Sequence, residues 1–312
     1  MDPLDTSELV IKRLVWTAGL GWWLAALAAC SSEKSSADPA NNAAPDPVPA
    51  PAGPAEPAPV TPPLAAVVLD SGAAFREWVR TLGPDRLTLV LKLNRIDLKH
   101  ARAGDTLVVP ADTSLGPADL APFPLRITLL DSVPKLLAVS RRIQAFAAYD
   151  SGRLVRWGPT STGKRATPTP AGLFFTNWKA KQTRSTDNDE WILNWYFNFD
   201  NARGVSFHEY ALPGYPASHA CVRLPAEDAK WIYDWADQWK LSRDGLVVLR
   251  WGTPVVVFED YDDKAPPPWR HLMSEPEAAT VPTSRFDSVV TGYLPTIRAR
   301  RPRPDSASTP NP

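Results

Sequence analysis

The sequence predicts a mainly β protein whose strand-rich part is preceded by a small module of two strands and two helices. Runs of β-branched and aromatic residues with partial alternation recur after Pro124, and a single helical pattern interrupts them. Residues 64–112 instead follow the order strand, helix, helix, strand. The chain has 34 Lys and Arg against 34 Asp and Glu, so no overall field attracts nucleic acid, and no nucleic-acid partner is expected.

The first 30 residues are typical of an export signal. Lys12 and Arg13 precede an almost uncharged apolar run, 14–29, which is shorter than the roughly 20 residues of a membrane span and suits a signal peptide. The run ends in "LAAC", which resembles the lipobox of bacterial lipoproteins, and this implies that Cys30 is the lipid-attachment site. The next residue is not the aspartate of inner-membrane retention, so we expect a periplasmic protein anchored in the outer membrane. An uncleaved anchor is the alternative.

Residues 31–63 form a linker that cannot bury a core. Ten of the 34 prolines lie in it, together with many alanines, which favours extended polyproline II conformation. A linker of this kind suits a tether between a membrane and a folded domain.

Residues 64–112 follow the linker as a compact pattern. "AAVVLD" and "GDTLVVP" read as strands, and "AAFREWVRTL" has apolar residues at helical spacing. The segment "LNRIDLKHARAGDTLVVP" resembles the second half of a LysM glycan-binding module, which implies contact with glycan. The family's usual opening is missing, so an unrelated α/β cap remains the alternative. Residues 113–135 are interpreted as a connector.

The strand-rich part contains eight candidate strands, and "DSG" at 150–152 suits a hairpin turn between two of them. The strands are "PLRITLL", "KLLAVS", "RIQAFAAYD", "RLVRWGPTST", "GLFFTNWKA", "WILNWYFNF", "GVSFHEY" and "TPVVVFED". The one helix, "PAEDAKWIYDWADQW", has a proline near its start and acidic residues in its first turn. Trp231, Trp235 and Trp239 recur every four residues and predict a core-facing stripe. Residues 261–312 are expected to be an irregular tail.

Residues 217–224, "ASHACVRL", raise the question of chemistry. Cys221 lies two residues after His219 and 13 after His208. A neighbouring imidazole can take the thiol proton, which makes a cysteine nucleophilic. Three interpretations stay open on the residues alone: a structural cysteine, a zinc site that lacks an obvious fourth ligand, and a Cys/His acyl-transfer site.

Three segments in one order then point to a known family. "HEYALPGYPASHACVRLP" resembles the signature of YkuD-type L,D-transpeptidases, and "VRWGPTSTGKRATPTPAGLF" and "LPAEDAKWIYDWAD…WGTPVVVFED" resemble the segments before and after it. The resemblance covers residues 136–260. It implies a β-sandwich-like catalytic domain with a short helix, and no cofactor or metal.

The resemblance also implies roles for individual residues. Cys221 would be the nucleophile, His208 the general base and His219 an orienting residue. The backbone around Ala220 would stabilise the oxyanion, and Ser218 would brace the turn.

The family acts on peptidoglycan stem peptides. Arg223 and Tyr215 are expected to contact this substrate, although Arg223 is equally expected to brace the loop. The implied function is a peptidoglycan L,D-transpeptidase that forms or edits cross-links, or attaches proteins to the wall, through a cysteine acyl-enzyme. The alternatives are a hydrolase of the same fold, such as an L,D-carboxypeptidase or amidase, and a non-catalytic wall-binding lipoprotein.

Two positions depart from the family pattern. Ala220 stands where a glycine is usual, and alanine costs on the order of 1 kcal/mol if the backbone there has a positive φ. Glu209 follows the histidine where a small residue is common. Neither change removes the nucleophile or the base.

Overall fold

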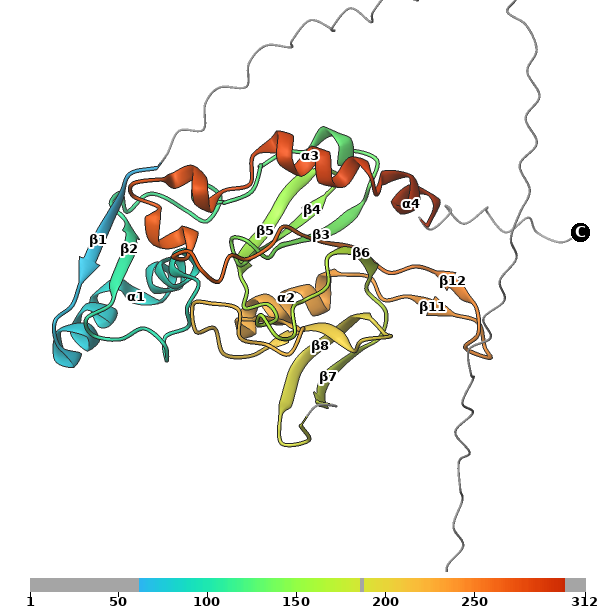
Figure 1. The fold of residues 1–312 in the computed structure, drawn as a ribbon, viewed down its shortest axis with the longest axis horizontal. Coiled ribbons are helices and arrows are strands. Elements are labelled where there is room, and N and C mark those ends of the chain that lie inside the picture. Colours follow the sequence, from blue (N-terminus) through green and yellow to red (C-terminus); the bar gives the residue numbers. More distant parts are fainter. Residues whose placement is uncertain (1–61, 186–187, 301–312) are drawn as a thin grey trace, which may run out of the picture. The chain divides into compact units, whose positions relative to one another are not determined.

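The computed structural model describes residues 62–185 and 188–300 (Figure 1). The predicted signal peptide, the lipobox with Cys30 and nearly all of the linker lie outside the described residues. Within the described part, no helix has the length and apolarity that crossing a membrane requires.

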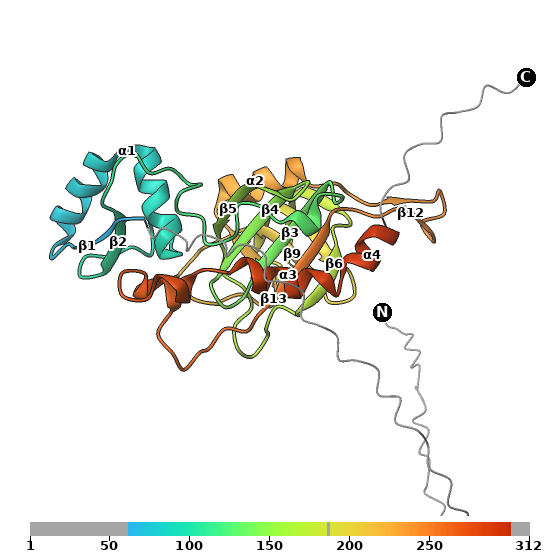
Figure 2. The same ribbon diagram turned by 90° about the horizontal axis from the view of Figure 1, so that it is seen from above.

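The N-terminal module has the predicted order of elements (Figure 2). Strands β1 (Leu64–Val68) and β2 (Thr106–Pro110) pair in antiparallel fashion around helix α1 (Gly72–Asn94). Gly83 interrupts this helix with a φ of 72° and a proline follows it, so α1 is two helices joined at a sharp kink. Its identification as a LysM-like module stays a prediction.

Two sheets form the main domain, and each mixes parallel and antiparallel pairs. The first has the order β5-β4-β3-β13-β6, and the second has the order β10-β9-β8-β7. Their bounds are β3 (Lys135–Ser140), β4 (Ala145–Asp150), β5 (Arg153–Pro159), β6 (Gly172–Phe175), β7 (Lys179–Arg184), β8 (Ile192–Asp200), β9 (Val205–Glu209), β10 (Val222–Leu224) and β13 (Pro254–Phe258).

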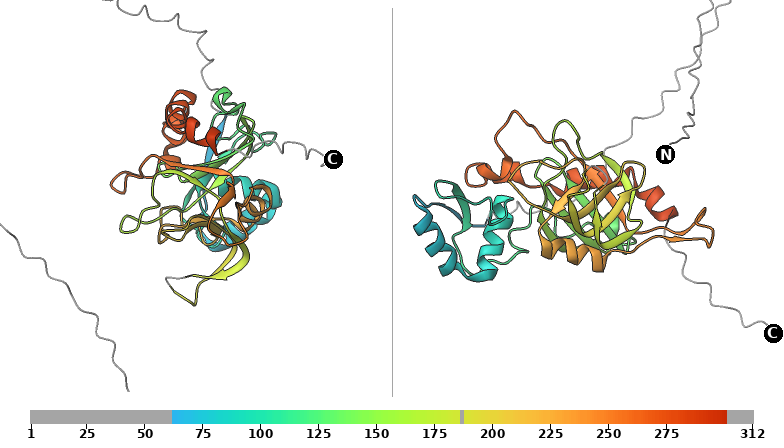
Figure 3. Two further views of the ribbon diagram at one scale, coloured as in Figure 1. Left: turned by 90° about the vertical axis from the view of Figure 1, so that its right-hand side faces the viewer. Right: turned by 90° about the horizontal axis from the view of Figure 1, so that it is seen from below.

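The two sheets, drawn from two further sides in Figure 3, share one apolar core. Val139 and Phe146 of the first sheet pack with Phe197 and Phe207 of the second, and Ile232 of helix α2 (Ala226–Trp235) joins them. This packing confirms the prediction of a mainly β sandwich with a short helix.

The far face of the first sheet is covered by the C-terminal segment, so the prediction of an irregular tail is wrong for much of 261–312. Residues 268–299 form the short helices η2 (Pro268–His271) and η3 (Pro276–Ala279), then α3 (Thr283–Thr291) and α4 (Leu294–Ala299). Phe286, Val290, Leu294 and Ile297 are all buried in a second core. Their spacing of three or four residues is helical, and that was the overlooked signal.

Two further expectations need correction. "PLRITLL" is no strand: it ends in the 3-10 helix η1 (Thr128–Leu130), because Ile127 and Leu130, three residues apart, both point into the core. The tryptophan stripe borders the core and does not fill it: Trp231 and Trp235 pack against the core cluster, and Trp239 lies beyond the end of α2. Trp231 and Trp235 are half-buried and stack on each other at 4.9 Å, while the core face of α2 is offset to Ala229 and Ile232.

Several contacts fasten the N-terminal module to the main domain, among them those of Lys92, Arg95 and Asp97. The side chain of Arg95 is fully buried, donates to the carbonyl of Ile143 at 3.0 Å and lies near the Trp157 and Trp269 rings. Burial lowers the pKa of its guanidinium to about 9. Further on, the amide of Asp97 donates to the carbonyl of Leu212, and the Asp97 carboxylate accepts from the Leu212 amide at 2.8 Å. The module therefore holds the loop that leads to Cys221.

Candidate active site

The parallel pairing of β9 and β10 brings the reactive side chains to one face. Val222 pairs with Phe207 and Arg223 with His208. Because side chains alternate along strands, Phe207 and Val222 enter the core, and His208 and Arg223 take the opposite face. Cys221 directly precedes β10 and lies beside Ser206, with 3.4 Å between sulfur and hydroxyl oxygen.

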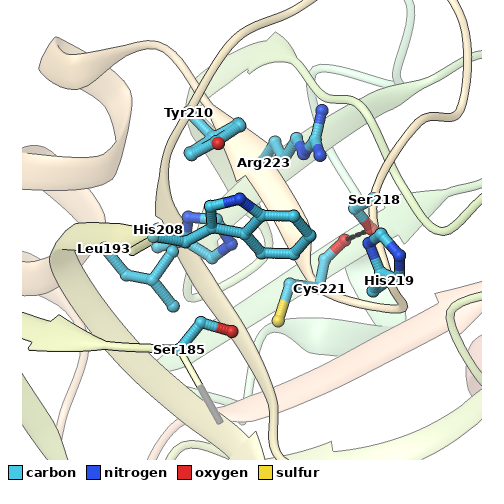
Figure 4. A pocket seen from close by; sticks show the side chains of 9 residues that line it. Ser185, Leu193, His208, Tyr210, Ser218, His219, Cys221 and Arg223 are labelled. Atoms are coloured by element: carbon cyan, nitrogen blue, oxygen red, sulfur yellow. Dashed lines mark hydrogen bonds between the residues drawn. The ribbon is translucent and has the colours of Figure 1, made fainter. Parts of the chain in front are cut away.

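Five of the predicted site residues line one open pocket with an empty volume of about 310 Å³ (Figure 4). The pocket is lined by Ser185, Trp191, Leu193, His208, Tyr210, Ser218, His219, Cys221 and Arg223. Ala220 lies between two lining residues in the sequence. Tyr215 is not in the lining, and 54% of it is exposed. Among the described residues, Tyr210 is the tyrosine that lines the pocket.

Tyr210 could have been found from the sequence. It lies two residues after His208 at the end of a strand, and period-two alternation puts both side chains on one side. Its ring lies beneath the guanidinium of Arg223, 4.5 Å from ring centroid to guanidinium carbon. Leu193 lies on β8, which pairs with β9, and Trp191 directly precedes β8; no local pattern indicated these two residues.

His208 is held as a neutral imidazole with a defined tautomer. Its Nδ1 is 2.9 Å from the carbonyl oxygen of Glu209. A carbonyl only accepts, so Nδ1 carries the proton and Nε2 keeps its lone pair. Burial lowers the pKa of His208 to about 4, and the positive charge of Arg223 also lowers it. At neutral pH this ring can accept a proton.

His219 has different surroundings. It is exposed, its Nε2 lies 2.9 Å from the ammonium of Lys164, and its ring contacts that of Trp191 at 5.0 Å. An ammonium only donates, so Nε2 accepts and Nδ1 carries the proton of the neutral ring. His219 contacts Lys164 and Trp191, and its orienting role stays a prediction.

The turn before Cys221 is fixed by hydrogen bonds to its carbonyls. Ser218 Oγ donates to the carbonyl of Cys221 (dashed in Figure 4), and Thr169 Oγ1 donates to that of Ala220 at 2.7 Å. The amide of Lys164 donates to the carbonyl of Ser218 at 3.0 Å. A Cβ atom at Gly163 would lie 2.1 Å from the Thr167 carbonyl oxygen. Only glycine therefore lets the backbone at residue 163 approach the backbone at residue 167 this closely.

Ala220 has a φ of 91°, a conformation that L-residues with a side chain avoid. We expect Ala220→Gly to relieve this strain and raise the free energy of unfolding by up to about 1 kcal/mol. Ala217→Gly is the matched control. Ala217 has no positive φ, so this change should lower stability through added chain entropy alone.

Urea unfolding of the wild type and the two variants measures these effects. A loss of stability in Ala220→Gly as large as that in Ala217→Gly would mean that the backbone at 220 is not strained.

The low pKa of His208 predicts a pH-dependent stability. The unfolded chain has the usual histidine pKa of 6.5 and the folded chain one of about 4, so between these values the unfolded state binds more protons. The free energy of unfolding should therefore fall as the pH drops from 6.5 to 4, by about 3 kcal/mol from this group. Urea unfolding of wild type and His208→Gln across this window tests it. Parallel curves for the two proteins would contradict the buried neutral state.

A zinc site finds no support in the side-chain arrangement. Within residues 62–185 and 188–300, no group of three or more His, Cys, Asp or Glu side chains is placed to hold a metal ion. His208 and His219 line the same pocket as Cys221, but His208 Nδ1 contacts a backbone carbonyl and His219 Nε2 contacts Lys164.

Known proteins resemble this chain over the residues that form the site. The model of the YkuD family, described as the L,D-transpeptidase catalytic domain, matches residues 134–257. No curated protein matches the chain. Among solved structures, the L,D-transpeptidase of Stackebrandtia nassauensis is 23% identical with a TM-score of 0.34, over 41% of this chain and 57% of that one. The L,D-transpeptidase of Mycobacterium smegmatis is 22% identical with a TM-score of 0.32, over 40% and 59%.

The catalytic domain of the E. faecium L,D-transpeptidase is 25% identical with a TM-score of 0.30, over 40% of this chain and 96% of that one. The match thus spans less than two thirds of the first two proteins and nearly all of the isolated catalytic domain. Residues 134–257 of this chain form a domain of the YkuD family.

Proposed function

We propose that this protein is a peptidoglycan L,D-transpeptidase that works through a thioester on Cys221. The observation that carries the proposal is the pairing, in one pocket, of a cysteine with a buried neutral histidine whose Nε2 keeps its lone pair. This is the pair that acyl transfer from a peptide requires.

The first half-reaction forms the thioester. His208 Nε2 takes the thiol proton, and the Cys221 sulfur attacks the carbonyl carbon at the L-centre of a donor stem peptide. Backbone N–H groups around Ala220 and Cys221 stabilise the oxyanion. The C–N bond then breaks, and the proton on His208 passes to the leaving amine.

The second half-reaction releases the product. The amine of an acceptor gives a proton to His208 and attacks the thioester carbon, and the sulfur leaves as the thiolate. Arg223 is half-buried on the ring of Tyr210, and burial lowers the pKa of its guanidinium. Such a cation at the pocket wall suits a carboxylate of the stem peptide, while its backbone pairs with Ser161 and braces the loop.

The rival activity is hydrolysis, in which water replaces the acceptor amine. Incubation of the protein with purified muropeptides, followed by mass analysis of the products, separates the two. Cross-linked dimers or amine-exchanged stems support the transpeptidase. Shortened stems alone identify a carboxypeptidase, and unchanged muropeptides with a folded protein favour a non-catalytic wall-binding role.

Two parts of the proposal concern location. We infer that the chain is exported and lipid-anchored at Cys30 in the outer membrane, facing the periplasm. Mass analysis of the native N-terminus tests this, and a native protein beginning at Met1 would contradict it. We also infer that residues 64–112 contact wall glycan. A loss of sedimentation with purified sacculi on substituting exposed residues of α1 would support that contact.

A further inference from the structure

The hairpin after helix α2 belongs to neither sheet. Strands β11 (Lys240–Leu241) and β12 (Val248–Arg250) pair only with each other and extend beyond the sheets, as Figures 1 and 2 both show. None of its residues lines the pocket of Cys221.

The tip of this hairpin is apolar and exposed. Leu246 is 83% exposed, Val247 55% and Leu249 61%, so three large aliphatic side chains lie within four residues in water. Single exposed apolar residues are ordinary, but a contiguous group on a projecting element marks an interaction surface.

The turn that carries these side chains is internally ordered. The Ser242 amide donates to the carbonyl of Val247 at 2.8 Å, and the Val247 amide donates to Ser242 Oγ at 3.0 Å. The Asp244 carboxylate accepts from the Leu246 amide and from Ser242, and these bonds lower its pKa. The tip is therefore held outward by its own hydrogen bonds.

The surroundings of the tip are positively charged. Lys240, Arg243 and Arg250 are exposed, and none of them forms an ion pair within the described part of the chain. Asp244 is the one acidic residue between Lys240 and Arg250, and its carboxylate accepts a hydrogen bond from the Leu246 amide within the turn. The hairpin thus combines an apolar tip with an excess of cations.

The end of helix α4 adds to this charge at the base of the hairpin. The guanidinium of Arg300 lies 4.1 Å from the ring centroid of Trp251 and 5.0 Å from that of Phe175. Trp251 directly follows β12, and Trp239 directly precedes β11. Two indole rings therefore flank the hairpin where it leaves the domain.

We propose that this hairpin docks on a bilayer of anionic lipid, with Leu246, Val247 and Leu249 inserted among the acyl chains. Apolar side chains at the tip, cations around them and tryptophans behind them match the successive layers of a membrane interface. This contact is made by the folded domain and is separate from the proposed lipid on Cys30 and from the reaction at Cys221.

The test measures the environment of the hairpin tip directly, because the N-terminal segment is also expected to bind lipid and would by itself hold the chain on a vesicle. The full chain with Cys30→Ser and Cys221→Ser is labelled at Leu246→Cys with an environment-sensitive fluorophore. The matched control carries the label at Met273→Cys, a residue that is 54% exposed between η2 and η3. Both proteins are added to phosphatidylcholine vesicles with or without phosphatidylglycerol, and circular dichroism checks that they are folded.

We expect a blue shift of the label at 246 on anionic vesicles and no shift at 273. Replacing Lys240, Arg243 and Arg250 by Gln should weaken the insertion equilibrium by about fivefold per charge. A label at 246 that stays in water on a vesicle-bound chain would overturn the proposal. So would equal shifts at both positions or on both kinds of vesicle. A shift that grows with protein concentration without vesicles would instead assign the tip to contact between copies of this chain.

Discussion

A carbapenem should add one drug mass to the wild-type protein and none to Cys221→Ala. The thiolate of Cys221 attacks the β-lactam carbonyl, the C–N bond of the ring opens, and the nitrogen takes a proton. Nothing leaves, so the adduct keeps the whole mass of the drug. Carbapenems mimic the acyl donor of the family that this domain belongs to. Intact-protein mass spectrometry with peptide mapping measures the addition and its position.

The control for the nucleophile is Ser206→Ala. Its hydroxyl lies 3.4 Å from the sulfur and is another candidate for attack. This variant should still be acylated at Cys221. Acylation of Cys221→Ala would disprove the nucleophile assignment, and an unmodified but folded wild type would favour the non-catalytic wall-binding role.

His208→Gln should slow acylation by about 10²–10⁴-fold, the usual contribution of a general base. Glutamine keeps a donor for the carbonyl of Glu209 and removes the Nε2 lone pair, so the loss reports proton transfer more than packing. His219→Gln is the matched control, because His219 lines the same pocket but is exposed and bonded to Lys164. Its effect should stay below about tenfold.

The pH profile distinguishes a base from a structural histidine. A ring with a pKa of about 4 stays neutral through mildly acidic conditions, so acylation by the wild type should persist down to about pH 5. Equal rate losses in His208→Gln and His219→Gln, measured by stopped-flow acylation, would remove His208 from the role of base.

Local sequence patterns predicted most of the strands and the helix α2. Alternation of apolar residues predicted β9, and the two residues Ser151 and Gly152 predicted the turn between β4 and β5, where both have a positive φ. The sequence also indicated the unusual backbone at residue 220, because alanine stands there where the YkuD family pattern usually has glycine. The observed φ of 91° agrees with that expectation.

Patterns failed where burial depends on a partner far along the chain. The apolar stripe of α3 and α4 could be interpreted only once the first sheet that it covers was known. The tryptophans of α2 were expected to face the core, but Trp231 and Trp235 pack at its border, and Ala229 and Ile232 fill it. Tyr215 was expected to contact the substrate, but it does not line the pocket. Tyr210 lines it instead, because that residue continues the face of β9.

The sequence by itself determined the chemistry that this protein offers: one cysteine with two nearby histidines, in segments whose order is that of a known catalytic domain. Only the tertiary structure decided the protonation state and the surroundings of those groups. The pKa of His208 follows from its burial and from Arg223, and the pocket wall follows from Leu193 on another strand and from Trp191 directly before that strand. Residue identity and spacing are local properties, whereas desolvation and electric field are sums over side chains that only folding brings together.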